Sequence, residues 1–357
     1  MDNAFYYNAL TKEENGNYAS LKKLYDFCGG NWKTGYQKYK ENNPIIRDPA
    51  EEWKKLAFSG MRLVLLDTPE YPQLLKEISH PPLGIYIRGE SPKPDKIPIA
   101  IVGTRKATND GKTITRNFAG ELAKAGFAII SGLAFGIDAS AHEGCLDVGG
   151  ATVAVLASGI NIISPRTNAR LAERILKNGG AIISEYPPGS EAQPYRFLER
   201  NRIISGLSKG VLVIEAPESS GALATVRFAT EQNRDVFIVP GPIAHPNFVG
   251  SHHLIRNGAE LVAKPEHIME AYGIIQETER TENNLEGSHS RIFSDKIRDG
   301  KPEEKSVLDA LRANAQGTDV DKIITIAKLE PRIVNRTLSF LLIKGLIKET
   351  ESGYAIK

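Results

Sequence analysis

Cysteine, tryptophan and methionine are scarce in this chain of 357 residues, which contains 2 Cys, 2 Trp and 3 Met. Cys28 and Cys145 are far apart in the sequence and lack the paired spacing of a zinc ribbon or a redox motif. We interpret them as two reduced structural thiols. The seven histidines show no HExxH or related ligand spacing, so the sequence predicts no metal site.

An excess of one charge sign and long apolar runs are also missing. The net charge is only +2, so any DNA-binding site must come from local clustering of basic residues and not from a general polycation. The N-terminus shows no basic start followed by an apolar run, and no stretch approaches the roughly 18 apolar residues of a membrane span. We therefore expect a soluble, cytoplasmic protein without membrane association.

The composition that remains is typical of folded domains. Hydrophobic residues make up 41% of the chain, which is enough to build a core, and the length predicts two or three domains. Residues 1–90 are rich in aromatics and lysine, with amphipathic stretches at 18–28 and 51–58, and we expect a small helical N-terminal domain there. Prolines at positions 81, 82, 92 and 94 mark its end, because a helix cannot continue through them.

From residue 91 to residue 273 the pattern changes to short apolar runs separated by helix-length segments. Continuous apolar strands that alternate with helices are typical of a parallel sheet covered on both faces. The sequence therefore predicts a doubly wound α/β domain with a mostly parallel sheet. Its expected strands are Ile99–Val102, Phe127–Ile130, Thr152–Leu156, Ala181–Ser184, Gly210–Ile214 and Val236–Val239.

The C-terminal part begins with a polar stretch at 274–302, which we interpret as a flexible linker. Residues 303–357 then show three helical patterns, at 304–315, 320–328 and 331–344, followed by a short hairpin. Three helices and a hairpin predict a winged-helix domain. Arg332, Arg336 and Lys344 form one basic face on the third helix, which is either a DNA-recognition surface or a solvated helix face.

Two loops that follow expected strands carry the pattern of a phosphate site. Gly103, Thr104 and Arg105 follow the first strand, and Ser131, Gly132 and Gly136 lie in the loop after the second. Such loops lie at the carboxyl edge of the sheet, where backbone N–H groups and helix N-termini bind anions. The first loop lacks GxGxxG, which argues against a dinucleotide. Within the helix that follows the second loop, His142 has no nucleophile or carboxylate pair nearby and is expected to be a packed helix residue.

The sequence does not favour a nucleotide-hydrolysing site. Gly111-Lys112-Thr113 matches the end of a Walker loop, and Glu215 follows a strand as in a Walker B motif. The Walker spacing requires glycine where Lys106 stands, so Lys112 is expected in the exposed first turn of a helix. A phosphoribohydrolase signature, PGGxGTxxE, fails similarly, because Phe228 occupies the glutamate position. A nucleotide-processing hydrolase stays the alternative function.

Further basic residues follow later strands. Arg166 lies in a Pro-Arg-Thr-Asn loop, and Phe197, Arg200, Asn201 and Arg202 lie at the start of a helix. Arginine with a nearby aromatic ring is typical of sites for phosphates and unstacked bases. The alternative is that the arginines form ion pairs with Glu185 and Glu199. A structural scaffold that binds no nucleic acid would leave these arginines unexplained.

Several of these segments together resemble the DNA-processing protein A (DprA/Smf) family. The matching stretches are AIVGTR, ISGLAFGIDASAH, TVAVLASGIN, SEYPPG, RNRIISGLS, VLVIEA, FIVPG and GSHHLIRNGAELV, in order across residues 99–262. The resemblance implies an extended Rossmann-like fold, no cofactor and no enzymatic activity. It implies binding of incoming single-stranded DNA, delivery to a RecA-type recombinase, and roles in natural transformation (competence) and DNA recombination.

The resemblance also assigns roles to residues. It places DNA contacts at Arg105, Arg166, Arg200 and Arg202, which we expect to form one electropositive crevice with the glycine loops. It associates the segment 251–262 with homodimer contacts, through His252, Leu254 and Leu261. For Leu254 and Leu261, a place in the core of the single chain is the alternative.

Overall fold

The structure of the protein is a computed structural model that describes residues 2–44, 46–90, 95–274, 302–312, 318–343, 347–350 and 353–356. The chain divides into two compact units, Met1–Glu277 and Thr278–Lys357. Nearly all of the predicted linker at 274–302 lies outside the described residues. In the described part, no helix is long and apolar enough to cross a membrane.

A nine-stranded sheet forms the centre of the first unit, with the strand order β1-β2-β6-β5-β4-β3-β7-β8-β9. All strands from β6 to β9 in this order are parallel, whereas β2 is antiparallel to both of its neighbours, β1 and β6. The six predicted strands are present, each within two residues of its predicted bounds, which confirms the doubly wound α/β fold. The strands are β1 (Arg62–Leu65), β2 (Gly84–Gly89), β3 (Ile97–Val102), β4 (Phe127–Ser131), β5 (Thr152–Leu156), β6 (Ala181–Ser184), β7 (Gly210–Val213), β8 (Asp235–Ile238) and β9 (Glu260–Leu261).

Helices cover both faces of this sheet, because alternate strand residues point to opposite sides. In β3, Ala100 and Val102 join the core under α5, α9, α10 and α11, whereas Ile99 and Ile101 join the core under α6, α7 and α12. The short helix α8 packs on β5 and β6. The helices are α5 (Gln73–Lys76), α6 (Asn109–Lys124), α7 (Ile137–Asp147), α8 (Ala169–Lys177), α9 (Pro194–Gly206), α10 (Gly221–Glu231), α11 (Val249–Arg256) and α12 (Pro265–Ala271), with 3₁₀ turns η1 (Arg166–Asn168) and η2 (Pro246–Phe248).

The strand order reverses at β3. From β3 the chain continues to β4, β5 and β6 on one side, and later adds β7, β8 and β9 on the other side. In open α/β sheets, a crevice forms where the order reverses, outside the carboxyl ends of the strands. The loops after β3 and β7 are therefore expected to border a binding site.

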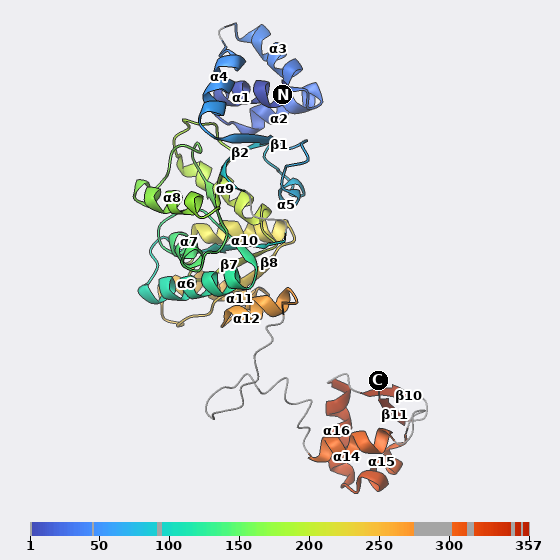
Figure 1. The fold of residues 1–357 in the computed structure, drawn as a ribbon. Coiled ribbons are helices and arrows are strands. Elements are labelled where there is room, and N and C mark those ends of the chain that lie inside the picture. The colour runs from blue at the N-terminus through green and yellow to red at the C-terminus, as the bar shows by residue number, and fades with distance from the viewer. Residues whose placement is uncertain are drawn as a thin grey trace. The chain divides into compact units, whose positions relative to one another are not determined.

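Four helices form the N-terminal part of this unit, and Figure 1 shows them gathered at one end of it, beyond β1 and β2. Their aromatic core contains Tyr7, Trp32 and Tyr36. The helical character predicted for this region is confirmed and its bounds as a domain stay a prediction, but the prediction missed β1 and β2, which extend the sheet. The helices are α1 (Asp2–Glu13), α2 (Tyr18–Cys28), α3 (Trp32–Asn42) and α4 (Pro49–Phe58).

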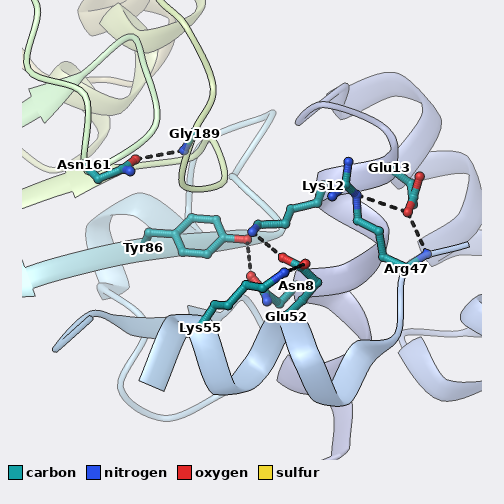
Figure 2. Close-up of polar contacts among 9 residues, drawn as sticks. All are labelled: Asn8, Lys12, Glu13, Arg47, Glu52, Lys55, Tyr86, Asn161 and Gly189. Carbon is teal, nitrogen blue, oxygen red and sulfur yellow. Dashed lines mark hydrogen bonds and ion pairs between the residues drawn. The ribbon is translucent and has the colours of Figure 1, made fainter. Parts of the chain in front are cut away.

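Buried polar contacts join these helices to the sheet and to one another (Figure 2). The Tyr86 hydroxyl of β2 donates to Asn8 Oδ1 of α1 at 3.0 Å. Beside it, the buried carboxylate of Glu52 accepts from Lys12 of α1 and, at 2.7 Å, from Lys55. A buried carboxylate that pairs with a lysine of another helix fixes the angle between α1 and α4, because an unpaired charge there would be strongly unfavourable.

The second unit contains the predicted three helices and hairpin. Val307, Ile323, Val334 and Leu338 pack together in its core. Arg332 and Arg336 are exposed on the third helix, as both interpretations of that face require, whereas Lys344 lies outside the described residues. The winged-helix assignment and its role stay predictions. The elements are α14 (Pro302–Arg312), α15 (Val320–Ala327), α16 (Pro331–Ile343), β10 (Ile347–Thr350) and β11 (Gly353–Ile356).

Candidate nucleic-acid interface

A pocket of about 550 Å³ lies at the reversal point, beyond the carboxyl ends of β3 and β7. Its walls come from the β3–α6 loop, the β4–α7 loop, the first turns of α9 and the N-terminus of α10. Sequence segments that are more than 100 residues apart thus meet at one edge of the sheet. The lining residues are Val102, Gly103, Thr104, Arg105, Lys106, Ala134, Asp138, Pro194, Phe197, Leu198, Arg200, Asn201, Ile204, Pro217, Ser219, Ser220, Gly221, Ala222 and Thr225.

The β3–α6 loop is held close to its neighbours by small residues. The Thr104 N–H donates to the Glu215 carbonyl at 2.8 Å, which ties this loop to the end of β7. Gly136 has a φ of 76° and lies directly against the carbonyls of Thr104 and Arg105, so any side chain there would collide with them. Gly103 has no room for a Cβ either, because Ile137 lies against it. The two predicted glycine loops therefore do face one crevice.

Glu215 holds the end of the β3–α6 loop in place. Its buried carboxylate accepts hydrogen bonds from the Thr108 N–H at 3.1 Å, from the Thr108 hydroxyl, and from Asn247 Nδ2 at 2.8 Å. Thr108 in turn caps α6 by accepting from the Gly111 N–H at 2.9 Å. Lys112 is exposed in the first turn of α6, as predicted. Glu215 thus holds Thr108 and Asn247 in place, and it shares with a Walker B carboxylate only its position after a strand.

Arg105 is one of two exposed cations that line the pocket, together with Lys106. Its guanidinium lies 4.7 Å from the centroid of the Phe197 ring, which is a cation–π contact between the β3–α6 loop and α9. The same ring has the Arg200 guanidinium at 5.9 Å. Phe197 was predicted as a base-stacking residue, and the structure brings it into the pocket as a support for two arginines.

Arg200 also lines the pocket, but it is buried, with 4% of its side chain exposed. Its Nη1 donates to the carbonyls of Gly132, at 2.7 Å, and Val155. Burial lowers the pKa of this guanidinium to about 10, although the nearby Asp138 carboxylate opposes the shift. With the 3.2 Å hydrogen bond from Nε to Asn201 Oδ1, these contacts use three of its five N–H groups inside the protein and hold the β4–α7 loop against α9 and β5.

The structure contradicts the expectation that Arg202 joins the same crevice. Arg202 does not line the pocket, and its guanidinium forms two hydrogen bonds with the Glu185 carboxylate, at 2.7 and 3.0 Å. Its other face lies over the Tyr18 ring at 5.4 Å. The reason is helical geometry: residues two apart on a helix point about 200° apart, so Arg200 and Arg202 face opposite sides of α9. The ion-pair alternative is therefore correct for Arg202.

The remaining predicted residues divide into lining and supporting positions. Asn201 lines the pocket and donates to the Gly221 carbonyl at 3.2 Å, whereas the buried Ser131 donates to the Ile101 carbonyl at 2.7 Å. Arg166 is exposed on η1 and does not line the pocket. Asn168 of the same turn donates to the Leu133 carbonyl at 2.9 Å, which holds η1 against the β4–α7 loop. Arg166 thus belongs to a segment that borders the crevice.

His142 is packed inside the protein, as predicted. Its Nδ1 is 2.7 Å from the Thr152 hydroxyl, and its imidazole is fully buried on α7. Burial, with a smaller contribution from the positive charge of Arg200, lowers the pKa of His142 to about 3. The imidazole is therefore neutral at physiological pH.

The sequence interpretation missed two parts of the pocket. The first is the N-terminus of α10, where Ser219, Ser220 and Gly221 line the wall. The Ser220 side chain accepts from the Ala222 N–H at 3.2 Å, and a Ser-Ser-Gly run after a strand was an available signal for such a cap. The second is Asp138, a buried carboxylate that accepts from the Gly132 N–H at 3.2 Å. Burial raises its pKa, and Arg200 is the foremost of the groups that oppose this shift.

The predicted dimer residues lie around α11 and β9. The His252 ring stacks on Phe248, with centroids 6.4 Å apart. Leu254 packs partly against the core, whereas Leu261 is 46% exposed on β9, the edge strand of the sheet. The core alternative thus fits Leu254 and not Leu261, and self-association stays a prediction.

Residues 62–273 match the family described as DNA recombination-mediator protein A. Protein Smf of Escherichia coli strain K12 is 46% identical over 208 residues, which cover 58% of this chain and 56% of that protein. A putative DNA processing protein DprA of Mycobacterium tuberculosis is 34% identical over 320 residues, covering 86% of this chain and 80% of that protein. The chain spans only a little over half the length of two relatives that are 46% identical to it: 56% of Protein Smf of Escherichia coli and 53% of Protein Smf of Synechocystis.

Solved structures agree with the fold. DNA processing protein A of Streptococcus pneumoniae has a TM-score of 0.59 and 31% identity, covering 75% of this chain and 92% of that one. DNA processing protein A of Helicobacter pylori has a TM-score of 0.53 and 27% identity, covering 59% of this chain and 95% of that one. The structure of the Helicobacter protein is described as giving insight into its single-stranded DNA binding mode.

Proposed function

The chain belongs to the DNA recombination-mediator protein A family, and from this premise we propose that its pocket binds single-stranded DNA. The observation that carries the proposal is the exposed Arg105 guanidinium, held on the Phe197 ring at the mouth of a pocket at the strand-order reversal. A guanidinium supported by an aromatic ring keeps its N–H groups directed outward, and these suit a phosphate.

The surroundings support an anionic ligand. The N-terminus of α10 lines the pocket, and helix N-termini favour anions through their free N–H groups and the helix dipole. The carboxylate of Asp138, which would repel a phosphate, is buried beside Arg200 and bonded to the Gly132 N–H. Arg105 and Lys106 are the exposed cations among the lining residues. Arg166, on the adjacent segment η1, is proposed as a further phosphate contact.

We propose that binding occurs without turnover. The Walker-like lysine, Lys112, is on a helix turn outside the pocket lining, and Glu215 is committed to Thr108 and Asn247. Phe228, at the position of the hydrolase glutamate, is also outside the lining. Sustained release of phosphate or base by the purified protein, abolished by Lys112→Ala or Glu215→Ala, would overturn this part of the proposal.

The wider roles are also proposals. They are delivery of single strands to a RecA-type recombinase, action as a homodimer in the cytoplasm, and a part in natural transformation. The description of the matched family as a recombination mediator supports the first of these.

Binding by the full chain tests the core of the proposal. Fluorescence anisotropy with a labelled thymidine oligonucleotide should show tighter binding than the matched duplex, because exposed base faces are available only in the single strand. Equal affinity for the two forms, or no binding of the single strand, would contradict the proposal.

A further inference from the structure

Three large apolar side chains are exposed on the segments that form the pocket. Phe135 in the β4–α7 loop is 48% exposed, and Tyr195 and Leu198 in the first turns of α9 are 54% and 53% exposed. Leu198 itself lines the pocket, and each aromatic residue is next in sequence to a lining residue, Ala134 or Pro194. Exposed aromatic rings beside a cationic pocket have the composition of a single-strand binding track.

Phe197 cannot serve as the free stacking surface in this arrangement. The guanidinium of Arg105 lies over its ring at 4.7 Å, with that of Arg200 at 5.9 Å, and the side chain is half-buried. A base that stacked on the face of the ring that Arg105 covers would have to displace this guanidinium, which is proposed to bind the phosphate. Phosphate binding and base stacking are therefore separated onto different side chains.

We propose that Phe135 is a base-stacking position for a single strand whose phosphate lies against Arg105. This inference rests on the proposed function and deepens it. The ring receives a base of any identity, because every base offers an apolar face. The ligand at this position is an unpaired nucleobase.

Tyr195 is exposed on the other side of α9 and is not assigned to the strand. It is two residues from Phe197, so the two side chains point about 200° apart, as those of Arg200 and Arg202 do. Its hydroxyl accepts from Arg196 Nε at 3.3 Å, and the Arg196 guanidinium lies 5.7 Å from its ring centroid. Tyr195→Ala therefore removes an exposed ring near the pocket without touching the proposed stacking position.

Phe135 is positioned by the backbone around it. Gly136, the next residue, lies against the carbonyls of Thr104 and Arg105. This contact places Phe135 beside the loop that carries the phosphate-binding arginine. A base on Phe135 and a phosphate on Arg105 can thus come from one short stretch of a strand.

The test compares two oligonucleotides of equal length, a thymidine oligomer and one in which the central nucleotides are abasic. Stacking on one aromatic residue contributes about 1–3 kcal/mol per base, so Phe135→Ala should weaken binding of the thymidine oligomer by about 5- to 150-fold, whereas Tyr195→Ala should leave it unchanged. Neither should weaken binding of the abasic oligomer appreciably. Arg105→Ala should weaken binding of both, since both contain phosphates. Phe135→Tyr should keep most of the affinity, because it retains the ring.

The matched control is Phe58→Ala, which removes a ring that is 97% exposed at the end of α4 and outside the pocket lining. It should change neither affinity, and thermal melting checks that all variants fold. Unchanged affinity of Phe135→Ala for the thymidine oligomer, or an equal loss on both oligomers, would overturn the stacking assignment and leave the proposed function standing. Failure of the unaltered chain to bind either oligomer would overturn the proposed function and this inference with it.

Discussion

Arg200 should matter more for folding than for contact with DNA. The side chain is 4% exposed, and its guanidinium donates to the carbonyls of Gly132 and Val155. A hydrogen bond to a charged group contributes about 1.5–3 kcal/mol, so the loss of two such bonds should lower the free energy of unfolding by about 3–6 kcal/mol. Arg200→Met is the informative change, because it keeps the apolar stem and removes the donors. Asp138 would also lose the positive charge that contributes most to lowering its pKa.

Thermal unfolding followed by circular dichroism measures this effect. A loss of 1 kcal/mol lowers the melting temperature by about 2 °C for a unit of this size, so Arg200→Met should melt roughly 6–12 °C below the unaltered protein. The matched control is Arg105→Met, whose side chain is exposed and should shift melting by no more than roughly 2 °C. If Arg200→Met melts within about 2 °C of the unaltered protein, the structural role assigned to Arg200 is wrong.

Three further predictions concern other parts of the chain. Because burial lowers the pKa of His142 to about 3, its imidazole takes up a proton in the unfolded chain at a higher pH than in the folded protein. The contribution of His142 to the free energy of unfolding is therefore complete above pH about 6.5 and falls by about 1.4 kcal/mol per pH unit below it. In His142→Gln, the free energy of unfolding from urea titrations should depend less steeply on pH below about 6.5, and an unchanged slope would contradict this. Removal of all residues after Ile274 should keep most of the single-strand affinity, since the pocket lies before that point; a large loss in anisotropy titrations would transfer the main site to Arg332 and Arg336. Leu261→Arg places a charge on the exposed edge strand β9 and should lower the mass in solution measured by light scattering if the segment forms a dimer; a soluble variant with unchanged mass would place the interface elsewhere.

The central strands could be predicted from the sequence because both of their faces are buried. A run such as Ala181–Ser184 has no polar alternation, and its bounds agree with the structure. The prediction missed strand β2, although Ile85, Tyr86 and Ile87 are buried, because the prolines before it indicate the end of a helical domain. Its antiparallel pairing with β6 depends on contacts about 95 residues away, which no local pattern reports.

The sequence could predict which loops meet at the pocket, but not which side chains line it. The glycine loops after β3 and β4 meet because parallel strands end at the same edge. The prediction failed for Arg202, because its partner Glu185 lies on a different segment and only the fold brings the two together. The stretch Phe197 to Arg202 looked like one basic cluster, and the helix distributes it over opposite sides.

The most direct test of the account is the salt dependence of single-strand binding by the unaltered chain and by Arg105→Ala. Each phosphate contact in a single strand contributes a slope of about −0.7 to log affinity against log salt concentration. We predict that Arg105→Ala binds a thymidine oligomer more weakly and with a slope flatter by roughly 0.7, and that Arg105→Lys restores the affinity only in part, because an ammonium lacks the fork of a guanidinium. Arg227→Ala, which removes an arginine exposed outside the pocket lining, should change neither quantity. A folded Arg105→Ala variant with unchanged affinity and slope would contradict the assignment of this pocket to DNA.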